Sequence, residues 1–345
     1  MAKMMNAILF EDTNKLTYTQ VPVPQLKNPD DVLIKVEAGS ICGTDLHILD
    51  GSYPANKGVV LGHEGTGVVV EVGPAVTAYK PGDRVVIDCN IPCGDCWQCK
   101  MGNLTQCENI YTIGIQTDGI FAEYAVITAR ALIKIPETMP VEDAIFAEPM
   151  ADIVNCIKRL QPMPWEVGLV LGAGPFGCLF VQLLKKCGVS KVFVSEPSAH
   201  RGEIALSLGA SRVVNPIKED LKQVILSETE GHGVDFVIDA VGSQFVAAID
   251  CVRARGRISL YGMNEKARPA VSQYEISRRE LTVLGSFACA DAFIEGLNLM
   301  SRGVMEMKPY VTHRLALKDF QAGFDATKAG EALEVILYPE WDHKA

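Results

Sequence analysis

The amino-acid sequence predicts an α/β protein in which a doubly wound parallel-sheet domain is joined to a second, β-rich domain. Three observations support this prediction. The chain has 345 residues, whereas single hydrophobic cores stop growing at roughly 250–300 residues. Its first 150 residues carry short β-branched runs between Gly/Pro turns. After Pro164, apolar strand patterns alternate with amphipathic helical patterns, as they do in βαβ units.

The β-rich domain is expected at 1–152, and the chain is expected to return to it at 290–345. Short β-branched runs in its first part predict strands at 32–38, 67–72 and 84–87. In the returning part, apolar residues at helical spacing predict helices at 292–302 and 317–327.

The α/β domain is expected at 153–289. Apolar runs predict strands at 168–172, 191–195, 212–214, 234–239 and 256–261. Helical spacing predicts helices between them at 176–187, 201–208 and 221–229. This alternation favours a parallel sheet with helices on both faces.

Composition excludes several classes of function. The chain has 32 Lys+Arg against 42 Asp+Glu, a formal net charge of −10, so a nucleic-acid-coating role is not expected. No apolar run reaches the ~20 residues of a membrane span. The start, Met-Ala-Lys-Met-Met-Asn, has no apolar signal core. We therefore expect a cytoplasmic protein that acts on a small molecule, with its 11 cysteines present as thiols or metal ligands.

Four of these cysteines have the spacing of a closed metal site. Cys93, Cys96, Cys99 and Cys107 form C-x2-C-x2-C-x7-C in a lobe expected at 89–110. Four thiolates at such spacing can hold one tetrahedral zinc ion, which would supply folding energy to a segment with little core of its own. Disulfides, an iron–sulfur cluster and a nucleic-acid-binding zinc ribbon are the alternatives. The expected reducing compartment counts against disulfides, and the seven-residue gap before Cys107 counts against an iron–sulfur cluster. The acidic composition counts against a nucleic-acid-binding ribbon.

A second constellation has the ligand count of a catalytic zinc that keeps one position for substrate. Cys42 and His63 are two ligands, and either Glu64 or Glu148 is the third. Pro149 favours an extended backbone at Glu148, which would aim that side chain into a cleft. Asp45 is placed to accept the second ring N–H of His63. The alternative is that Cys42 and His63 are ordinary buried residues.

A glycine-rich turn follows the strand expected at 168–172. Gly172, Gly174 and Gly177, with Pro175 and Phe176 between them, form G-x-G-x-x-G ahead of an amphipathic helix. Such a turn brings the backbone close to a pyrophosphate at the helix N-terminus. Gly262, after the strand expected at 256–261, joins the predicted cofactor residues.

An acidic residue sets the expected cofactor. Glu196 lies 19 positions past Gly177, at the end of the next strand. A carboxylate there can bind both ribose hydroxyls and would repel a 2′-phosphate, so NAD is expected rather than NADP. Arg201 is the alternative signal, because an arginine could bind that phosphate, stack near the adenine or remain solvated.

Together these motifs resemble the zinc-dependent medium-chain dehydrogenase/reductases over essentially the whole chain. They are, in order, Cys42-Gly-Thr44-Asp45, Gly62-His63-Glu64-x-x-Gly67, Gly82-Asp83-Arg84-Val85, the four-cysteine lobe, Glu148-Pro149 and the glycine-rich turn. The resemblance implies a GroES-like catalytic domain with a Rossmann domain inserted in it. It further implies NAD and two zinc ions per chain, one catalytic and one structural.

Glu148-Pro149, where simple alcohol dehydrogenases carry a cysteine, resembles the polyol and threonine dehydrogenase branch. The stretch 279–287 and Thr312-His313-Arg314 support the same branch. Two pairs of residues depart from its pattern. Ala288 and Cys289 stand where sorbitol dehydrogenases typically have Arg-Tyr, and Asp152 and Asn155 stand where many relatives have a small residue and a histidine. Cys289 could therefore face the substrate.

The resemblance implies reversible oxidation of a secondary alcohol of a polyol, sugar alcohol or vicinal diol to a ketone. Thr44 could accept the released proton, and His47 could pass it to water by way of the cofactor ribose, or lie on the surface without a role. Threonine or a sugar-alcohol phosphate is an alternative substrate. Five arginines could bind a phosphate or form a solvated face: Arg253, Arg255, Arg257, Arg278 and Arg279. A non-catalytic protein that binds zinc and NAD as a regulator is the alternative of another class.

The resemblance also implies a homo-oligomer, a tetramer or a dimer. The region 285–290 is a candidate sheet edge at which copies of the chain could meet.

Overall fold

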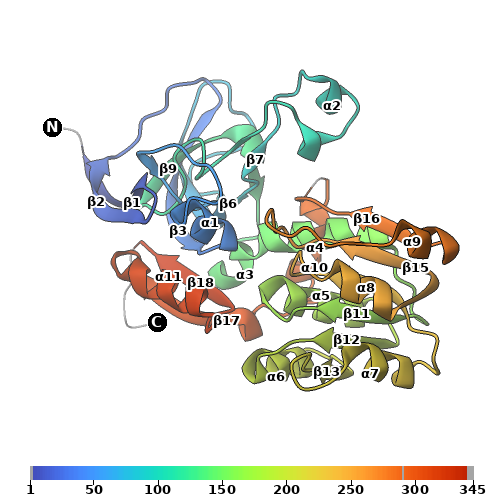
Figure 1. The fold of residues 1–345 in the computed structure, drawn as a ribbon. Coiled ribbons are helices and arrows are strands. Elements are labelled where there is room, and N and C mark those ends of the chain that lie inside the picture. The colour runs from blue at the N-terminus through green and yellow to red at the C-terminus, as the bar shows by residue number, and fades with distance from the viewer. Residues whose placement is uncertain (1–2, 290, 340–345) are drawn as a thin grey trace. The chain divides into compact units, whose positions relative to one another are not determined.

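The computed structural model describes residues 3–289 and 291–339 (Figure 1). The chain divides into two units, one formed by 1–148 together with 293–345 and the other by 149–292. Residues 1–2, 290 and 340–345, which were assigned above to the two parts of the β-rich domain, lie outside the described residues. Each unit is described by itself.

The first unit is mainly β-structure. Its strands are β1 (Met4–Asp12), β2 (Lys15–Pro22), β3 (Asp31–Ser40), β4 (Val59–Val60), β5 (Glu64–Val72), β6 (Arg84–Ile87), β7 (Asn90–Ile91), β8 (Tyr111–Thr112), β9 (Tyr124–Thr128), β10 (Leu132–Lys134), β17 (Val311–Ala316) and β18 (Glu334–Tyr338). Its helices are α1 (Gly43–Leu49), α2 (Trp97–Lys100), α3 (Val141–Ile145), α10 (Phe293–Ser301) and α11 (Phe320–Ala329), with short 3₁₀ turns η1 (Leu104–Gln106), η2 (Ala129–Ala131), η3 (Lys308–Tyr310) and η4 (Leu317–Asp319).

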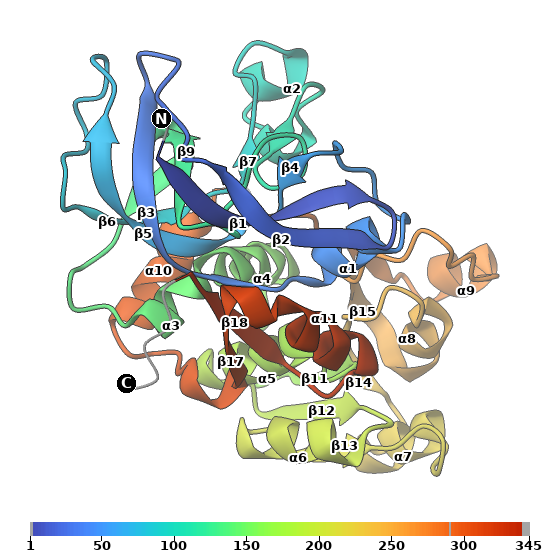
Figure 2. The same cartoon turned by 90° about the vertical axis from the view of Figure 1, so that its left-hand side faces the viewer.

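A mixed sheet forms the centre of this unit. Its order is β10-β6-β5-β3-β18-β17, with β9 also paired to β3. A separate sheet, β2-β1-β4, contains the long β1–β2 hairpin, and β7 pairs with β8 beside the lobe that carries α2 (Figure 2). The GroES-like β-rich domain expected from the sequence is thereby present.

The C-terminal segment completes the same sheet. Strand β18 pairs antiparallel with β3, with Ile336 opposite Ser40, and β17 lies parallel to β18. The red C-terminal elements therefore lie beside the blue N-terminal strands in Figure 1. Helix α11 covers β17 and β18 and ends at Gly330, whose φ of 74° is the left-handed conformation that favours glycine.

The second unit alternates strands and helices. Its strands are β11 (Val167–Leu171), β12 (Lys191–Ser195), β13 (Arg212–Val214), β14 (Val234–Asp239), β15 (Val252–Leu260) and β16 (Thr282–Gly285). Its helices are α5 (Pro175–Lys186), α6 (Ala199–Ser207), α7 (Leu221–Glu228), α8 (Phe245–Cys251) and α9 (Gln273–Arg278), and it includes most of α4 (Ala147–Leu160).

Six parallel strands form one sheet in this unit, in the order β13-β12-β11-β14-β15-β16. The chain order reverses between the two central strands β11 and β14, and the space at their carboxyl ends is therefore the topological switch point of the sheet. Helix α5 contacts α6 and α7 contacts α8, so the two halves of the sheet are covered by separate helix pairs. The doubly wound Rossmann architecture predicted from the strand–helix alternation is confirmed.

Helix α4 corrects the expectation at Glu148. The backbone there is not extended, because Glu148 and Pro149 lie in the first turn of a 14-residue helix. The first N–H groups of a helix have no partner within it, so a proline at this place removes no hydrogen bond. The buried stripe of Met150, Ile153 and Leu160 supplies the packing that decides the local conformation.

Among the helices that the structure describes, none is both long and apolar enough to cross a membrane.

Candidate metal centres and nucleotide site

Three potential ligands of different chemistry come together in the first unit. Cys42 caps the N-terminus of α1, His63 follows β4, and Glu64 begins β5. Their sulfur, nitrogen and oxygen ligand atoms all lie within 4.8 Å of one another. Gly62 makes this turn possible, because its φ is 92° and a Cβ would lie 2.4 Å from the Phe121 ring. A thiolate, an imidazole and a carboxylate are ligands that zinc accepts.

Two buried atoms behind these ligands also fit a metal ion. Asp45 is fully buried, and its Oδ2 accepts the Cys42 N–H at 3.0 Å. Its Oδ1 faces His63 Nδ1 at 3.6 Å, and neither atom has a hydrogen-bond partner among the described residues. That distance is longer than a hydrogen bond, so acceptance of the ring N–H by Asp45 stays a prediction. An imidazole turned this way presents Nε2 to an ion.

The electrostatics of this cluster call for a cation. Burial raises the pKa of the Cys42 thiol well above its usual value, and Glu64, Asp45 and Glu148 raise it further. Burial also raises the pKa of Asp45 to about 6. For His63, burial lowers the pKa, but the neighbouring carboxylates outweigh it and the pKa is raised. A divalent ion would favour the deprotonated thiolate and carboxylates and would therefore lower these pKa values again.

The two candidate third ligands are placed differently. Glu64 belongs to the converging group, and its Oε2 accepts the Ser40 hydroxyl at 2.7 Å. Glu148 lies outside that group, and its Oε1 accepts the Cys89 thiol at 3.8 Å. It is still close enough to raise the pKa of Cys42. The geometry favours Glu64.

A further carboxyl beside this site was missed from the sequence. Glu334 begins β18, is buried, and has no partner for Oε1 within the described part of the chain. Burial raises its pKa well above the usual value, Glu64 and Glu148 add to the rise, and the Ser40 hydroxyl opposes it. A lone glutamate before an apolar strand has no motif, and only the pairing of β18 with β3 brings it here.

The two proposed proton-relay residues are less buried. Thr44 Oγ1 lies 3.7 Å from Cys42 Sγ, and its side chain is partly exposed. His47 is exposed, and its Nδ1 contacts the Ser52 hydroxyl at 3.2 Å. Both lie on the short helix α1 next to Cys42.

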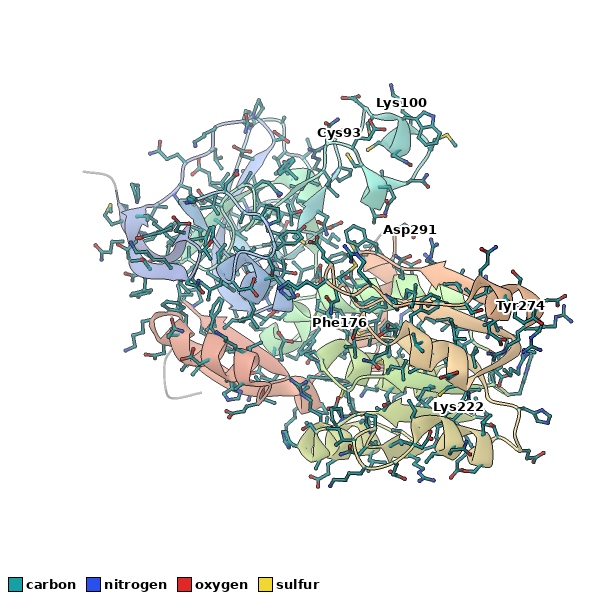
Figure 3. All side chains as sticks on the ribbon, in the orientation of Figure 1. Cys93, Lys100, Phe176, Lys222, Tyr274 and Asp291 are labelled. Carbon is teal, nitrogen blue, oxygen red and sulfur yellow. The ribbon has the colours of Figure 1, made fainter. Side chains whose placement is uncertain are left out.

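The four-cysteine lobe is assembled as a closed site. The ligand atoms of Cys93, Cys96, Cys99 and Cys107 lie within 4.8 Å of one another, and none of the eleven cysteines, all of which the structure describes, forms a disulfide. Backbone N–H groups donate to the sulfurs, for example Cys93 N–H to Cys107 Sγ at 3.2 Å. N–H bonds from Asp95 and Cys96 lower the pKa of Cys93 to about 6. These features fit a metal held by four thiolates. Figure 3 labels Cys93 on this lobe.

The glycine-rich turn joins β11 to α5 in the second unit. Gly172 has a φ of 94°, and a Cβ on Gly177 would lie 2.0 Å from the Gly172 carbonyl oxygen. A Cβ on Gly174, by contrast, would meet nothing within 4 Å. Gly174 is the N-cap of α5 and Pro175 is its first residue. The turn is thus packed on the protein side and open at the helix N-terminus, where an anion would bind.

Glu196 lies directly after β12 and faces this turn. Its Oε2 accepts the Ala173 N–H at 2.7 Å, and its Oε1 accepts the Ser198 N–H at 2.8 Å. Arg201, in the first turn of α6, has a buried Nε without a partner among the described residues. Glu196 therefore contacts the glycine-rich turn, and Arg201 lies close enough to Cys178 of α5, the helix that follows the turn, to affect its pKa.

The remaining predicted cofactor residues lie at the carboxyl ends of the strands. The Phe176 ring, labelled in Figure 3, packs on Tyr261 with centroids 5.2 Å apart. A Cβ on the next residue, Gly262, would lie 2.3 Å from the Gly242 nitrogen. This close approach explains the glycine at 262 by packing between the segments that follow β14 and β15. Cys289, which was singled out as a possible substrate contact, is buried.

Comparison with known families agrees with both units. Residues 28–137 match the alcohol dehydrogenase GroES-like domain, and residues 175–302 match the zinc-binding dehydrogenase domain.

Known relatives and structures cover nearly the whole chain. An L-threonine 3-dehydrogenase from Caldanaerobacter subterraneus subsp. tengcongensis is 35% identical, over 92% of this chain and 93% of its own. The structure of a zinc-binding dehydrogenase from Sinorhizobium meliloti 1021 bound to NADP matches with a TM-score of 0.93 at 32% identity, covering 98% of this chain and all of that one. That of 2R,3R-butanediol dehydrogenase from Bacillus subtilis matches with a TM-score of 0.89 at 28% identity, covering 97% and 100% of the two chains.

Proposed function

Since the chain belongs to the zinc-dependent alcohol dehydrogenase family of medium-chain dehydrogenases and is an oxidoreductase of that family, we propose that it oxidises a secondary alcohol to a ketone with NAD. The substrate is proposed to carry a hydroxyl or amino group on the neighbouring carbon. The convergence of Cys42, His63 and Glu64 within 4.8 Å carries the proposal. With one position left open, these three ligands suit a catalytic rather than a structural ion.

The residues of each site have distinct proposed roles. Cys42, His63 and Glu64 would hold the catalytic zinc, while the four cysteines of the lobe would hold the structural one. When bound, the catalytic ion would supply a Lewis acid for the substrate oxygen, and the nicotinamide a hydride acceptor. Asp45 orients His63 from behind, because its carboxylate faces Nδ1 from a fully buried position.

The proton released from the substrate hydroxyl needs an acceptor. Thr44 is proposed to relay it, accepting the proton at Oγ1 while its own hydroxyl proton moves on toward His47 by way of the cofactor ribose, since this hydroxyl lies 3.7 Å from the Cys42 sulfur. His47 is proposed to pass it on to water, because its ring is exposed and contacts Ser52. Both groups belong to α1, so one short helix would position the metal ligand and the proton path together.

NAD is proposed as the cofactor because Glu196 lies at the end of β12 beside the glycine-rich turn. Its carboxylate can accept hydrogen bonds from the ribose hydroxyls and would repel a 2′-phosphate. The zinc-binding dehydrogenase from Sinorhizobium meliloti was solved with NADP. A preference for NAD therefore cannot be carried over from that relative, and the proposal for this chain rests on Glu196.

The proposed substrate class is based on the substrates for which two relatives are named. L-Threonine has a hydroxyl beside an amino-bearing carbon, and 2R,3R-butanediol has two neighbouring hydroxyls. A polyol or other vicinal diol and a β-hydroxy amino acid therefore belong to one proposed class. The five clustered arginines give no support for a phosphorylated substrate. Each is bonded within its own unit, with partners Asp235, Glu280, Glu166, Glu275 and the backbone of Ile249 and Val252.

A substrate panel with NAD tests this proposal. L-Threonine, 2R,3R-butanediol, sorbitol and isopropanol are compared by the appearance of NADH. We expect turnover with at least one of the first three and a much lower kcat/KM with isopropanol, which has no neighbouring polar group. Equal turnover of isopropanol would refute the substrate class, and no NADH with any secondary alcohol would refute the reaction.

A further inference from the structure

A short segment at the carboxyl end of the parallel sheet has an unusual backbone. Residues 286–289, here called the 286–289 segment, follow the edge strand β16. Ser286 N–H still donates to Leu260 O at 3.2 Å, so the segment leaves the sheet next to the end of β15. Ala288 then has a φ of 52°, a left-handed conformation that non-glycine residues seldom adopt. The surrounding structure must hold such a conformation in place.

Asn155 of α4 provides that support. Its Nδ2 donates to Ala288 O at 2.7 Å and to Phe287 O at 3.3 Å, and only 9% of the residue is exposed. The amide must be turned this way, because its oxygen would otherwise face two carbonyl oxygens. One turn further along α4, Lys158 pairs with Asp291 at 3.1 Å, with both side chains exposed (Asp291 is labelled in Figure 3).

Asn155 binds the carbonyl groups of the segment, and the N–H groups of the same residues point to a different function. Within the residues that the structure describes, the N–H groups of Phe287 and Ala288 have no backbone acceptor. The Phe287 side chain is 47% exposed, although Ser286 and Cys289 on either side are buried. The segment therefore presents two N–H donors and one exposed aromatic ring between the buried Ser286 and Cys289.

The strand order indicates which half of the cofactor would lie here. Glu196, at the end of β12, marks the adenosine side, and the glycine-rich turn after β11 marks the pyrophosphate. The dinucleotide crosses the switch point between β11 and β14. Its nicotinamide half must then lie over the carboxyl ends of β14, β15 and β16, and the 286–289 segment lies at the last of these.

We propose that Asn155 is a positioning residue for the nicotinamide half of the cofactor, acting by clamping the Phe287 and Ala288 carbonyls so that the 286–289 segment keeps its left-handed turn. This inference rests on the proposed NAD-dependent function. The position carries a side chain that can donate two hydrogen bonds from one nitrogen, which the paired carbonyls require.

Ligand binding to the whole protein tests the clamp without turnover. Asn155→Leu keeps a side chain branched at Cγ but removes both N–H donors. We expect its Kd for NADH to rise about tenfold, as loss of a buried hydrogen bond does, while its Kd for ADP-ribose stays the same. ADP-ribose contains the adenosine and pyrophosphate but no nicotinamide, so it does not use the 286–289 segment. Fluorescence titration measures NADH, and calorimetry measures ADP-ribose.

Two further variants complete the test. Asn155→His retains a ring N–H donor and is expected to recover part of the NADH affinity. Lys158→Met removes only the exposed pair with Asp291 and is expected to change neither Kd. An equal loss of NADH and ADP-ribose affinity in Asn155→Leu would overturn the proposal in favour of general structural support, and unchanged NADH affinity would remove Asn155 from it. Wild-type protein that binds neither ligand would instead overturn the proposed function.

Discussion

At the scale of single residues, Cys42 is the ligand on which the proposed catalytic site depends most directly. Cys42→Ser replaces a thiolate, which binds zinc well, by a hydroxyl that stays protonated near neutral pH. We expect metal analysis to show one zinc per chain instead of two, and turnover to fall by more than about a hundredfold.

Cys187→Ser is the matched control, because Cys187 is an exposed thiol outside both cysteine groups. It should keep both ions and full activity. If Cys42→Ser retained two zinc ions or wild-type turnover, Cys42 would not be a ligand.

Glu196 provides a test of cofactor choice. Glu196→Gln preserves size and one acceptor oxygen for the Ala173 and Ser198 N–H groups but removes the charge. We expect the kcat/KM ratio of NAD to NADP to fall about tenfold, which corresponds to about 1.4 kcal/mol of lost repulsion. Glu203→Gln, on the exposed side of α6, should leave the ratio unchanged. An unchanged ratio in Glu196→Gln would assign the preference to other residues.

What the sequence could predict at this scale depended on local spacing. The cysteine pairs and the glycine-rich turn are short motifs, so their residues were found together before any fold was known. Glu334 and Asn155 have no such signal. Glu334 reaches the site only through the pairing of β18 with β3, and Asn155 reaches Ala288 across 133 positions of chain.

At the scale of elements, the four-cysteine lobe has little apolar core of its own. Trp97 is 64% exposed on α2, and Met101 beside it is also exposed. Cys96→Ser should therefore cost the lobe its zinc and most of its folding energy. We expect loss of one zinc per chain and rapid proteolysis within 89–110. A protease-resistant variant with both ions and only reduced turnover would contradict a structural role.

A salt bridge joins helix α3 to strand β17 of the returning C-terminal segment. Arg314 Nε and its terminal nitrogen bond the two oxygens of Glu142 at 2.5 and 2.7 Å, and the Tyr338 hydroxyl donates to Glu142 at 3.0 Å. The Arg314 bonds lower the pKa of Glu142, although burial opposes them. This pair thus stabilises the folded state above the unfolded pKa of glutamate, and the contribution is lost as the pH falls through the lowered value.

Arg314→Met should consequently lower stability by about 1 kcal/mol near neutral pH, the upper range for partly exposed pairs. The difference from wild type should shrink as the pH falls from about 4, the ordinary pKa of a glutamate, through the lowered pKa of Glu142. It should vanish only below that lowered pKa, where Glu142 is protonated in both the folded and the unfolded state. Thermal unfolding at several pH values measures it. Lys57→Met, which removes the well-exposed pair with Asp12, should have almost no effect. A difference that persisted in acid would show that the charge on Glu142 is not its source.

Helix α4 shows where reasoning from local preference failed. Pro149 disfavours a helical residue before it, and that rule predicted an extended Glu148. The same stretch also carries buried apolar residues at helical spacing, and the packing of this stripe outweighs the preference of one dipeptide. Near a helix N-terminus, proline is compatible with both signals.

At the scale of the whole molecule, the sheet order leaves β16 as one of the two edge strands of the parallel sheet. Its residues are mostly exposed, and Val283 at 36% places an apolar side chain on that edge. An open strand edge offers unpaired N–H and C=O groups to another strand. The sequence suggested an edge at 285–290, but the strand itself is Thr282–Gly285, and residue 290 lies outside the described part of the chain.

We therefore expect the chain to form a homo-oligomer in which β16 of two copies meet about a two-fold axis. In such an interface a residue near the axis lies close to its own copy, so Val283→Lys would place two like charges together. Light scattering with size-exclusion chromatography should show a smaller assembly for this variant than for wild type. Val246→Lys is the matched control, since Val246 is an exposed valine on α8 away from the edge, and it should leave the mass unchanged. A monomeric wild-type protein, or a Val283→Lys variant of undiminished mass, would refute this arrangement.

If β16 does pair, the 286–289 segment that follows it would be held from the sheet edge by the second copy as well as from α4 by Asn155. The Val283→Lys variant should then also bind NADH more weakly while binding ADP-ribose normally.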